Sequence, residues 1–146
     1  MSLSKPPVVT QKPYFPKFYQ VVQTQSPPVD NQWYTLLEET NVHLLLMTLK
    51  QTNGESANKS LQVRMTIDGT VYTGGLVSVA HNTTVYVALT SSGVPTSITT
   101  GNQNVGKYDS VKAQSIKVEY RLGDTGGTGQ TLTANLSYMK LEEATV

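Results

Sequence analysis

The chain has 146 residues with 11 Lys and Arg against 10 Asp and Glu, a net charge of +1, and this length suits one domain with a real core. So few and so balanced charges exclude the basic stripe that nucleic acid requires and the basic cluster that an anionic membrane attracts. We therefore expect no nucleic-acid partner and no membrane partner. With no cysteine in the chain, a disulfide framework and a thiolate metal site are both excluded.

The polar and β-branched positions are dominated by Thr, Val, Ser, Gln and Asn, while Glu, Lys and Ala are few. This composition favours strands and turns over helices. The first twenty residues contain no apolar core of a signal peptide, and no run reaches the ~20 apolar residues of a membrane span. We expect a protein that is made in the cytoplasm and is used there or assembled into a particle.

Residues 1–17 are predicted to form an extended arm in front of a single domain over 18–146. Four prolines block helix and ladder formation in this segment. A disordered tail is the alternative, but disordered segments are usually poor in aromatic residues. An ordered arm needs a surface, either on its own domain or on a neighbouring subunit. Its expected anchors are the aromatic residues at its base, namely Tyr14, Phe15, Phe18 and Tyr19.

The first strands are predicted over 18–24, 33–38 and 42–51, with a turn at 39–41 between the last two. The third strand is almost wholly apolar, which indicates burial on both faces. A sandwich core covers only one of these faces. We therefore expect the arm or an adjoining subunit to cover the second face, which consists of Leu45, Met47 and Leu49.

Residues 60–67 alternate between apolar and polar side chains, and Asp68-Gly69 predicts a two-residue hairpin into 70–73. Further strands are predicted at 76–80, 84–90, near 97–99, at 115–122 and at 130–141, and the last two also alternate, with Ile116 to Leu122 and Leu132 to Tyr138 inward at every second position. About eight short strands separated by turn signals predict an all-β fold, an antiparallel β-sandwich that is jelly-roll-like.

Catalytic and metal-binding patterns are missing from the sequence. His43 and His81 are the two histidines, and their spacing is not that of metal ligands. A zinc site would need them to converge with a carboxylate in the fold. There is no nucleophile elbow, and the glycine-rich stretch 123–129 lacks the lysine of a phosphate loop. We predict a protein that is not an enzyme and that has no cofactor and no metal.

Four aromatic residues could form a platform for a sugar ring, with Tyr86 pointing away from its apolar neighbours Val85 and Val87. Aromatic rings on outer faces often mark interfaces, although a lone outer tyrosine is usually an ordinary cross-strand partner. The predicted ligand face consists of Trp33, Tyr34, Tyr72 and Tyr86.

Three short motifs follow one another along residues 33–73, namely Trp33-Tyr34-Thr35, Leu44-Leu45-Leu46 and Thr66-Ile67-Asp68-Gly69. This stretch resembles small β-rich virion structural proteins of tailed phages or similar viruses. The resemblance implies a capsid, decoration or tail-associated subunit that is located in the virion and contacts copies of itself or other virion proteins symmetrically. A carbohydrate- or receptor-binding β-sandwich is the alternative function.

Overall fold

The computed structural model describes residues 14–29, 31–89, 95–100, 111–123 and 128–143. These residues form nine strands and no helix, which confirms the predicted all-β antiparallel sandwich. The strands are β1 (Tyr14–Gln25), β2 (Tyr34–Thr52), β3 (Lys59–Ile67), β4 (Thr70–Thr73), β5 (Val77–Val79), β6 (Thr84–Leu89), β7 (Pro95–Thr100), β8 (Val111–Leu122) and β9 (Thr131–Glu143).

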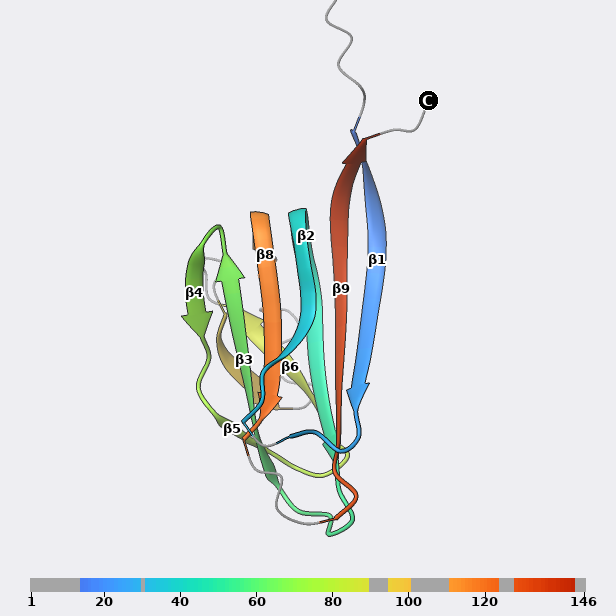
Figure 1. Cartoon of the computed structure of the whole chain (residues 1–146), viewed down its shortest axis with the longest axis vertical. Coiled ribbons are helices and arrows are strands. Elements are labelled where there is room, and N and C mark those ends of the chain that lie inside the picture. The colour runs from blue at the N-terminus through green and yellow to red at the C-terminus, as the bar shows by residue number, and fades with distance from the viewer. Residues whose placement is uncertain (1–13, 30, 90–94, 101–110, 124–127, 144–146) are drawn as a thin grey trace, which may run out of the picture.

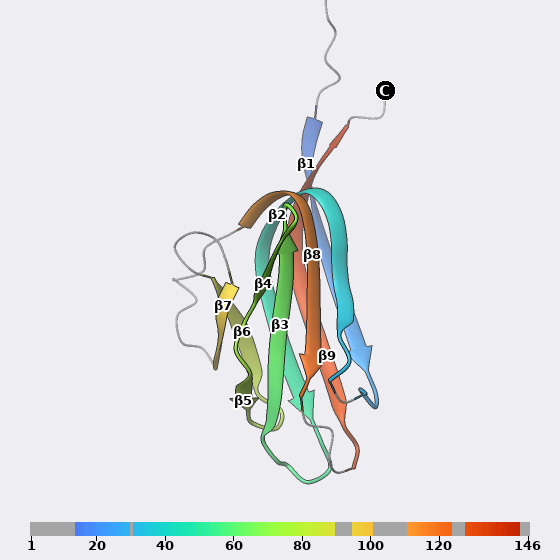
Figure 2. The same cartoon turned by 60° about the vertical axis from the view of Figure 1, so that its left-hand side comes forward.

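The sheet order is β1-β9-β2-β8-β3-β4, with β5 added to β3, β6 added to β2 and β7 added to β6. The long strand β2 links the two layers. Its first part pairs with β8 from Tyr34 to Leu44, and its second part pairs with β9 from Val42 to Thr52. Figure 2 shows β2 and β8 arching together at the top of the molecule, where one layer passes into the other.

The turn predicted at 39–41 is wrong, because β2 runs through these residues without a break. Asn41 takes a left-handed backbone conformation with φ of 53°, which asparagine tolerates better than most residues. The polar stretch therefore bends the strand instead of ending it. Residues that are typical of a turn serve here as the corner between the two layers.

The start predicted for the first strand, Phe18, is four residues late, because β1 begins at Tyr14. Pro16 argued against a strand at this point in the sequence. An edge strand nevertheless accommodates a proline, because the missing N–H would face solvent. Residues 14–17 thus belong to the sheet. The rest of the predicted arm, residues 1–13, lies outside the described residues, and its division from the domain stays a prediction.

The hairpin predicted at Asp68-Gly69 is confirmed, with φ of 48° and 85° at the two residues. Positive φ at both positions is the signature of the turn that best matches the twist of paired strands. The Asp68 carboxylate also accepts hydrogen bonds from the backbone N–H groups of Gln114 and Ser115, at 2.8 and 2.9 Å. The hairpin tip is thereby fixed to β8.

The core lies between the two layers and follows the predicted alternation of β3, β8 and β9. Full burial of each such side chain contributes about 1.5–3 kcal/mol relative to leaving it in water. The fully buried large side chains include Leu61, Val63, Met65, Ile116, Tyr120, Leu122, Leu132 and Leu136.

The predicted second apolar face of β2 is wrong for two of its three residues. Met47 and Leu49 are each 1% exposed and belong to the core, where they lie opposite Leu136 and Ala134 of β9. The pairing register shifts between Leu44 and Leu46, so a bulge inserts one extra residue and reverses which residues face inward. Leu45 lies at this bulge and is half-buried.

Candidate assembly surface

Strands β1 and β9 form a ribbon that projects beyond the neighbouring strands, as Figure 1 shows. They pair over twelve positions, from Tyr14 opposite Glu143 to Gln25 opposite Leu132. Among the described strands β1 bonds only to β9, so it forms an edge of the sheet. A strand edge presents a row of backbone donors and acceptors to solvent.

The outer face of this ribbon carries large apolar side chains. Phe18 is 70% exposed and Val22 is 57% exposed, while Leu141 on β9 is 49% exposed. Phe18 lies opposite Met139 and Pro16 lies opposite Leu141, which places all of them on one face because directly paired residues share a face. Exposed apolar groups gathered in this way mark an interaction surface more often than scattered ones do.

Of the predicted anchors, the structure describes the exposure of three. Phe15 and Phe18 are 58% and 70% exposed. Tyr19 is half-buried, and its ring stacks on Tyr138 with centroids 5.2 Å apart. Of these three, the two phenylalanines remain free to bind another surface, whereas Tyr19 packs against its own domain.

The inner side of the ribbon is held by polar contacts. The Tyr19 hydroxyl donates a hydrogen bond to the Glu142 carboxylate, and Lys17 Nζ lies 3.7 Å from the same carboxylate. The bond to Glu142 raises the pKa of Tyr19 to about 12. The same bond lowers the pKa of Glu142, and Lys17 lowers it further. The inner face of the ribbon thus has satisfied polar groups around Tyr19 and an exposed Phe15 beyond them, whereas the outer face carries mainly exposed apolar groups.

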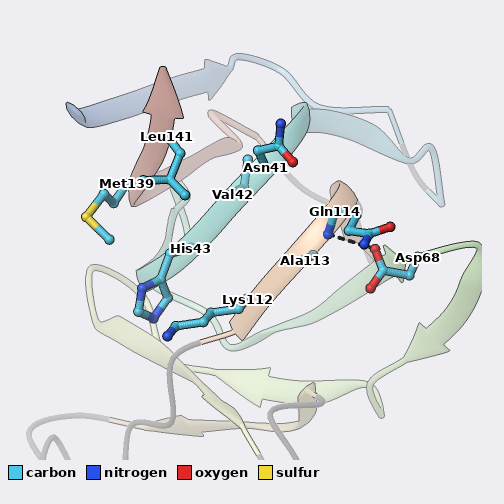
Figure 3. A pocket seen from close by; sticks show the side chains of 9 residues that line it. All are labelled: Asn41, Val42, His43, Asp68, Lys112, Ala113, Gln114, Met139 and Leu141. Carbon is cyan, nitrogen blue, oxygen red and sulfur yellow. Dashed lines mark hydrogen bonds between the residues drawn. The ribbon is translucent and has the colours of Figure 1, made fainter. Parts of the chain in front are cut away.

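A row of four side chains crosses the strands at the base of the ribbon. Phe18 lies opposite Met139, Met139 opposite His43, and His43 opposite Lys112. Beside this row is an open groove of about 470 Å³, shown in Figure 3. Its lining residues are Asn41, Val42, His43, Asp68, Lys112, Ala113, Gln114, Met139 and Leu141.

His43 is the unusual residue of this groove. Both of its ring nitrogens are buried, and neither has a hydrogen-bond partner among the residues that the structure describes. Burial lowers the pKa of His43, and the positive charge of Lys112 lowers it further. A buried polar atom without a partner is costly, so this end of the sheet is less well satisfied than an ordinary core.

Sequence reasoning missed Met139 and Leu141. The signal was present in β9, whose alternate positions are polar at Thr133, Asn135 and Ser137 and become apolar at Met139 and Leu141. The change in polarity along one face marks where the bare apolar surface begins. The prediction considered only the inward-facing positions of β9, so it did not identify this apolar surface.

The four residues of the predicted ligand face are not brought together. Trp33 lies between the guanidinium groups of Arg64 and Arg121, at 4.2 and 4.8 Å from its ring centroid. Tyr34 packs against the buried Tyr120, with ring centroids 5.8 Å apart.

The other two residues of that set lie on different layers. Tyr72 is paired with the fully buried Met65, so it points inward. Tyr86 is paired with Thr48 on the outer face of the opposite layer. A shared sugar platform is therefore not formed, although the prediction that Tyr86 points outward agrees with the register.

The two histidines lie far apart along the fold. His81 accepts a hydrogen bond from the backbone N–H of Asn53 at 3.0 Å, and ten residues of chain, mostly strand β2, separate this point from His43, about 30 Å at strand spacing. Among the described residues, no group of three or more potential ligands could hold a metal ion. Within the same residues, no helix has the length and apolarity to span a membrane.

No protein-family model and no curated protein matches the sequence. Among solved structures, a chain in the acidic stable capsid structure of Helicobacter pylori bacteriophage KHP30 is similar with a TM-score of 0.45 and 10% identity, over 90% of this chain and 100% of that one. A chain of the T=13 viral particle of IBDV has a TM-score of 0.39 and 16% identity over 86% of this chain. A chain of the infectious bursal disease virus VP2 subviral particle has a TM-score of 0.38 and 15% identity, also over 86%. This chain spans about a third of the length of the latter two, 31% and 33%.

Proposed function

We propose that this protein is a non-enzymatic virion structural subunit, a capsid, decoration or tail-associated component, that assembles with copies of itself and with other virion proteins. The observation that carries the proposal is the bare apolar outer face of the β1–β9 ribbon. Phe18, Val22 and Leu141 are each about half exposed or more on that face. Repeating particles need such a surface on every copy.

The driving force of this assembly is the burial of apolar area. Removing a phenylalanine or leucine side chain from water contributes about 1.5–3 kcal/mol, and aromatic anchors dominate the energetics of many interfaces. The outer face of the ribbon between Phe18 and Val22 carries no charged side chain. Association should therefore depend little on salt, since screening acts on charges.

The predicted arm takes a narrower role in this proposal. Phe15 and Phe18 act as anchors on the ribbon itself, and the residues before Tyr14 extend from its projecting end towards a neighbouring subunit. Docking of such a segment costs ordering entropy, which the buried aromatic area offsets.

The test is particle formation by the purified protein. Negative-stain microscopy and sedimentation velocity should show regular shells, tubes or rings whose amount rises with protein concentration and changes little between low and high salt. Replacing Phe18 and Leu141 together with serine should abolish these assemblies.

Val71→Ser is the matched control, because Val71 is also 58% exposed but lies on β4 at the opposite edge of the sheet. This variant should assemble like the wild type. A wild type that stays monomeric at every concentration would overturn the proposal. Assemblies that survive the double replacement would refute the role of the ribbon.

A further inference from the structure

We infer that β1 pairs with β1 of a second copy as an antiparallel strand, about a two-fold axis that passes through Gln20. This deepens the proposed function, since it names the first contact of assembly. The pairing would join two sheets into one continuous sheet across the axis, and each copy would contribute the same residues, as a two-fold contact requires.

The length and chemistry of the β1 edge support this pairing. Natural sheets usually protect their edges with short strands, prolines or lysines. In β1, Pro16 and Lys17 provide such protection only at the projecting end. The following residues Phe18–Gln25 have no charge and no proline, and the strand is twelve residues long. By contrast, β4 at the other edge has four residues.

The side chains around Gln20 are self-complementary. An axis at Gln20 places Phe18 opposite Val22 of the partner subunit on the outer face, and Tyr19 opposite Val21 of the partner subunit on the inner face. Aromatic side chains opposite β-branched ones are among the favourable cross-strand pairs. Each pair occurs twice, and the exposed area of Phe18 and Val22 is buried mutually.

Neighbouring registers lose these contacts. An axis at Val21 sets Phe18 against Thr24 of the partner subunit, and an axis at Tyr19 sets Lys17 against Val21 of the partner subunit. With the axis at Gln20, Lys17 meets the neutral Gln23 of the partner subunit and keeps its own Glu142 at 3.7 Å. No like charges meet across the contact.

The backbone fits the same register. A proline belongs where an edge strand would otherwise turn its N–H to solvent, so alternation places the free N–H and C=O groups of Phe18, Gln20 and Val22 on the open edge. An axis at Gln20 then brings these groups opposite one another, and each copy donates to the other. Pro16 falls near the end of the pairing, where its missing donor costs least.

Cysteine cross-linking tests the register directly, because the chain has no cysteine of its own. Gln20 is exposed and its side chain donates an exposed hydrogen bond to Asn135, at 3.0 Å, so Gln20→Cys should fold normally. Two copies of residue 20 would then lie about 5.5 Å apart between Cα atoms, which suits a disulfide. Under mild oxidation, this variant should form at least about ten-fold more covalent dimer than Thr24→Cys, whose two copies would lie roughly 26 Å apart.

Three outcomes decide between the ideas. Equal cross-linking of both variants, or preferential cross-linking of Val22→Cys, would overturn the axis at Gln20. Failure of Gln20→Cys to cross-link while the wild type still forms regular particles would refute this dimer and leave the virion proposal standing. Efficient cross-linking without particles would support the dimer and refute the virion proposal. As a check without cysteine, Gln20→Lys should dissociate the dimer, since two lysines would meet on the axis.

Discussion

The two ends of the sandwich differ in how they treat buried polar groups. At the end near Asn53, which we call the closed end, Gln51 and Asn53 are 0% and 5% exposed. Their amide groups bond to each other, to the Ala57 backbone and to the Val79 carbonyl. At the open end, both ring nitrogens of His43 are buried and have no hydrogen-bond partner within the described part of the chain. The buried amides of Gln51 and Asn53 are thus bonded within one chain, whereas the open end adjoins the bare ribbon that we propose as a contact.

The closed end also joins its loops to one another. Gly54 N donates to the Thr128 carbonyl at 2.7 Å, and the Glu55 carboxylate accepts bonds from both the N–H and the hydroxyl of Thr128. These bonds lower the pKa of Glu55. The contrast teaches that one end carries the local stability of the domain, while the other presents the features that suit association.

The largest effect should come from breaking the closed end. Asn53→Ala removes two donated and two accepted hydrogen bonds and leaves the buried Gln51 oxygen unpaired. Because a stranded buried polar group costs about 1–3 kcal/mol, we expect a loss of about 3 kcal/mol. Urea unfolding measures it, and the exposed Asn58→Ala serves as the control. A loss equal to that of the control would show that the network is not structural.

A smaller effect of opposite sign should come from the open end. His43→Leu removes two buried nitrogens that have no partner among the described residues, and we expect a gain of about 1 kcal/mol at pH 6. The folded pKa of His43 lies below its usual value of 6.5, so the unfolded chain binds the proton more tightly.

The sign of the pH dependence follows from that difference. Stability of the wild type should fall as the pH drops below 6.5, and the variant should lose this component. Urea unfolding between pH 7.5 and 5 measures both curves, with His81 present in each protein. Parallel curves for the two proteins would contradict the assignment to His43.

The smallest effect concerns the inner face of the ribbon. Glu142→Gln replaces the carboxylate that raises the pKa of Tyr19 to about 12, so that pKa should move back towards 10. A tyrosine titration followed by carbon NMR of the ring measures the change. Tyr120, whose pKa is raised by burial, should titrate as before. An unchanged Tyr19 would show that its hydroxyl is not bonded to Glu142 in solution.

Strands with a strict two-residue period were predictable, and the strands at 60–67, 115–122 and 130–141 all formed with the expected faces inward. Here each residue's polarity reports its side of the sheet. The bulge at Leu45 was not predictable, since neither glycine nor proline marks it. One inserted residue moved Met47 and Leu49 from an expected outer face into the core.

The bend of β2 at Asn41 was not predictable from the sequence either. Residues 39–41 have the composition of a turn, and only tertiary pairing with β8 decides that the strand continues. For the candidate site, the exposed aromatic anchors Phe15 and Phe18 were predictable. The groove was not, because it depends on which residues of β2, β8 and β9 become neighbours.

The long strand β2 has a consequence for how this protein is made. Its partners β8 and β9, like the partner of β1, lie roughly 70 to 130 residues further along the chain, a separation that slows folding. A ribosome must therefore complete β8 before the layer that contains β3 closes, and it must complete β9 before the layer that contains β1 closes. Until then the apolar residues of β2 stay accessible, and a chaperone that shields this segment during synthesis should raise the yield of folded protein.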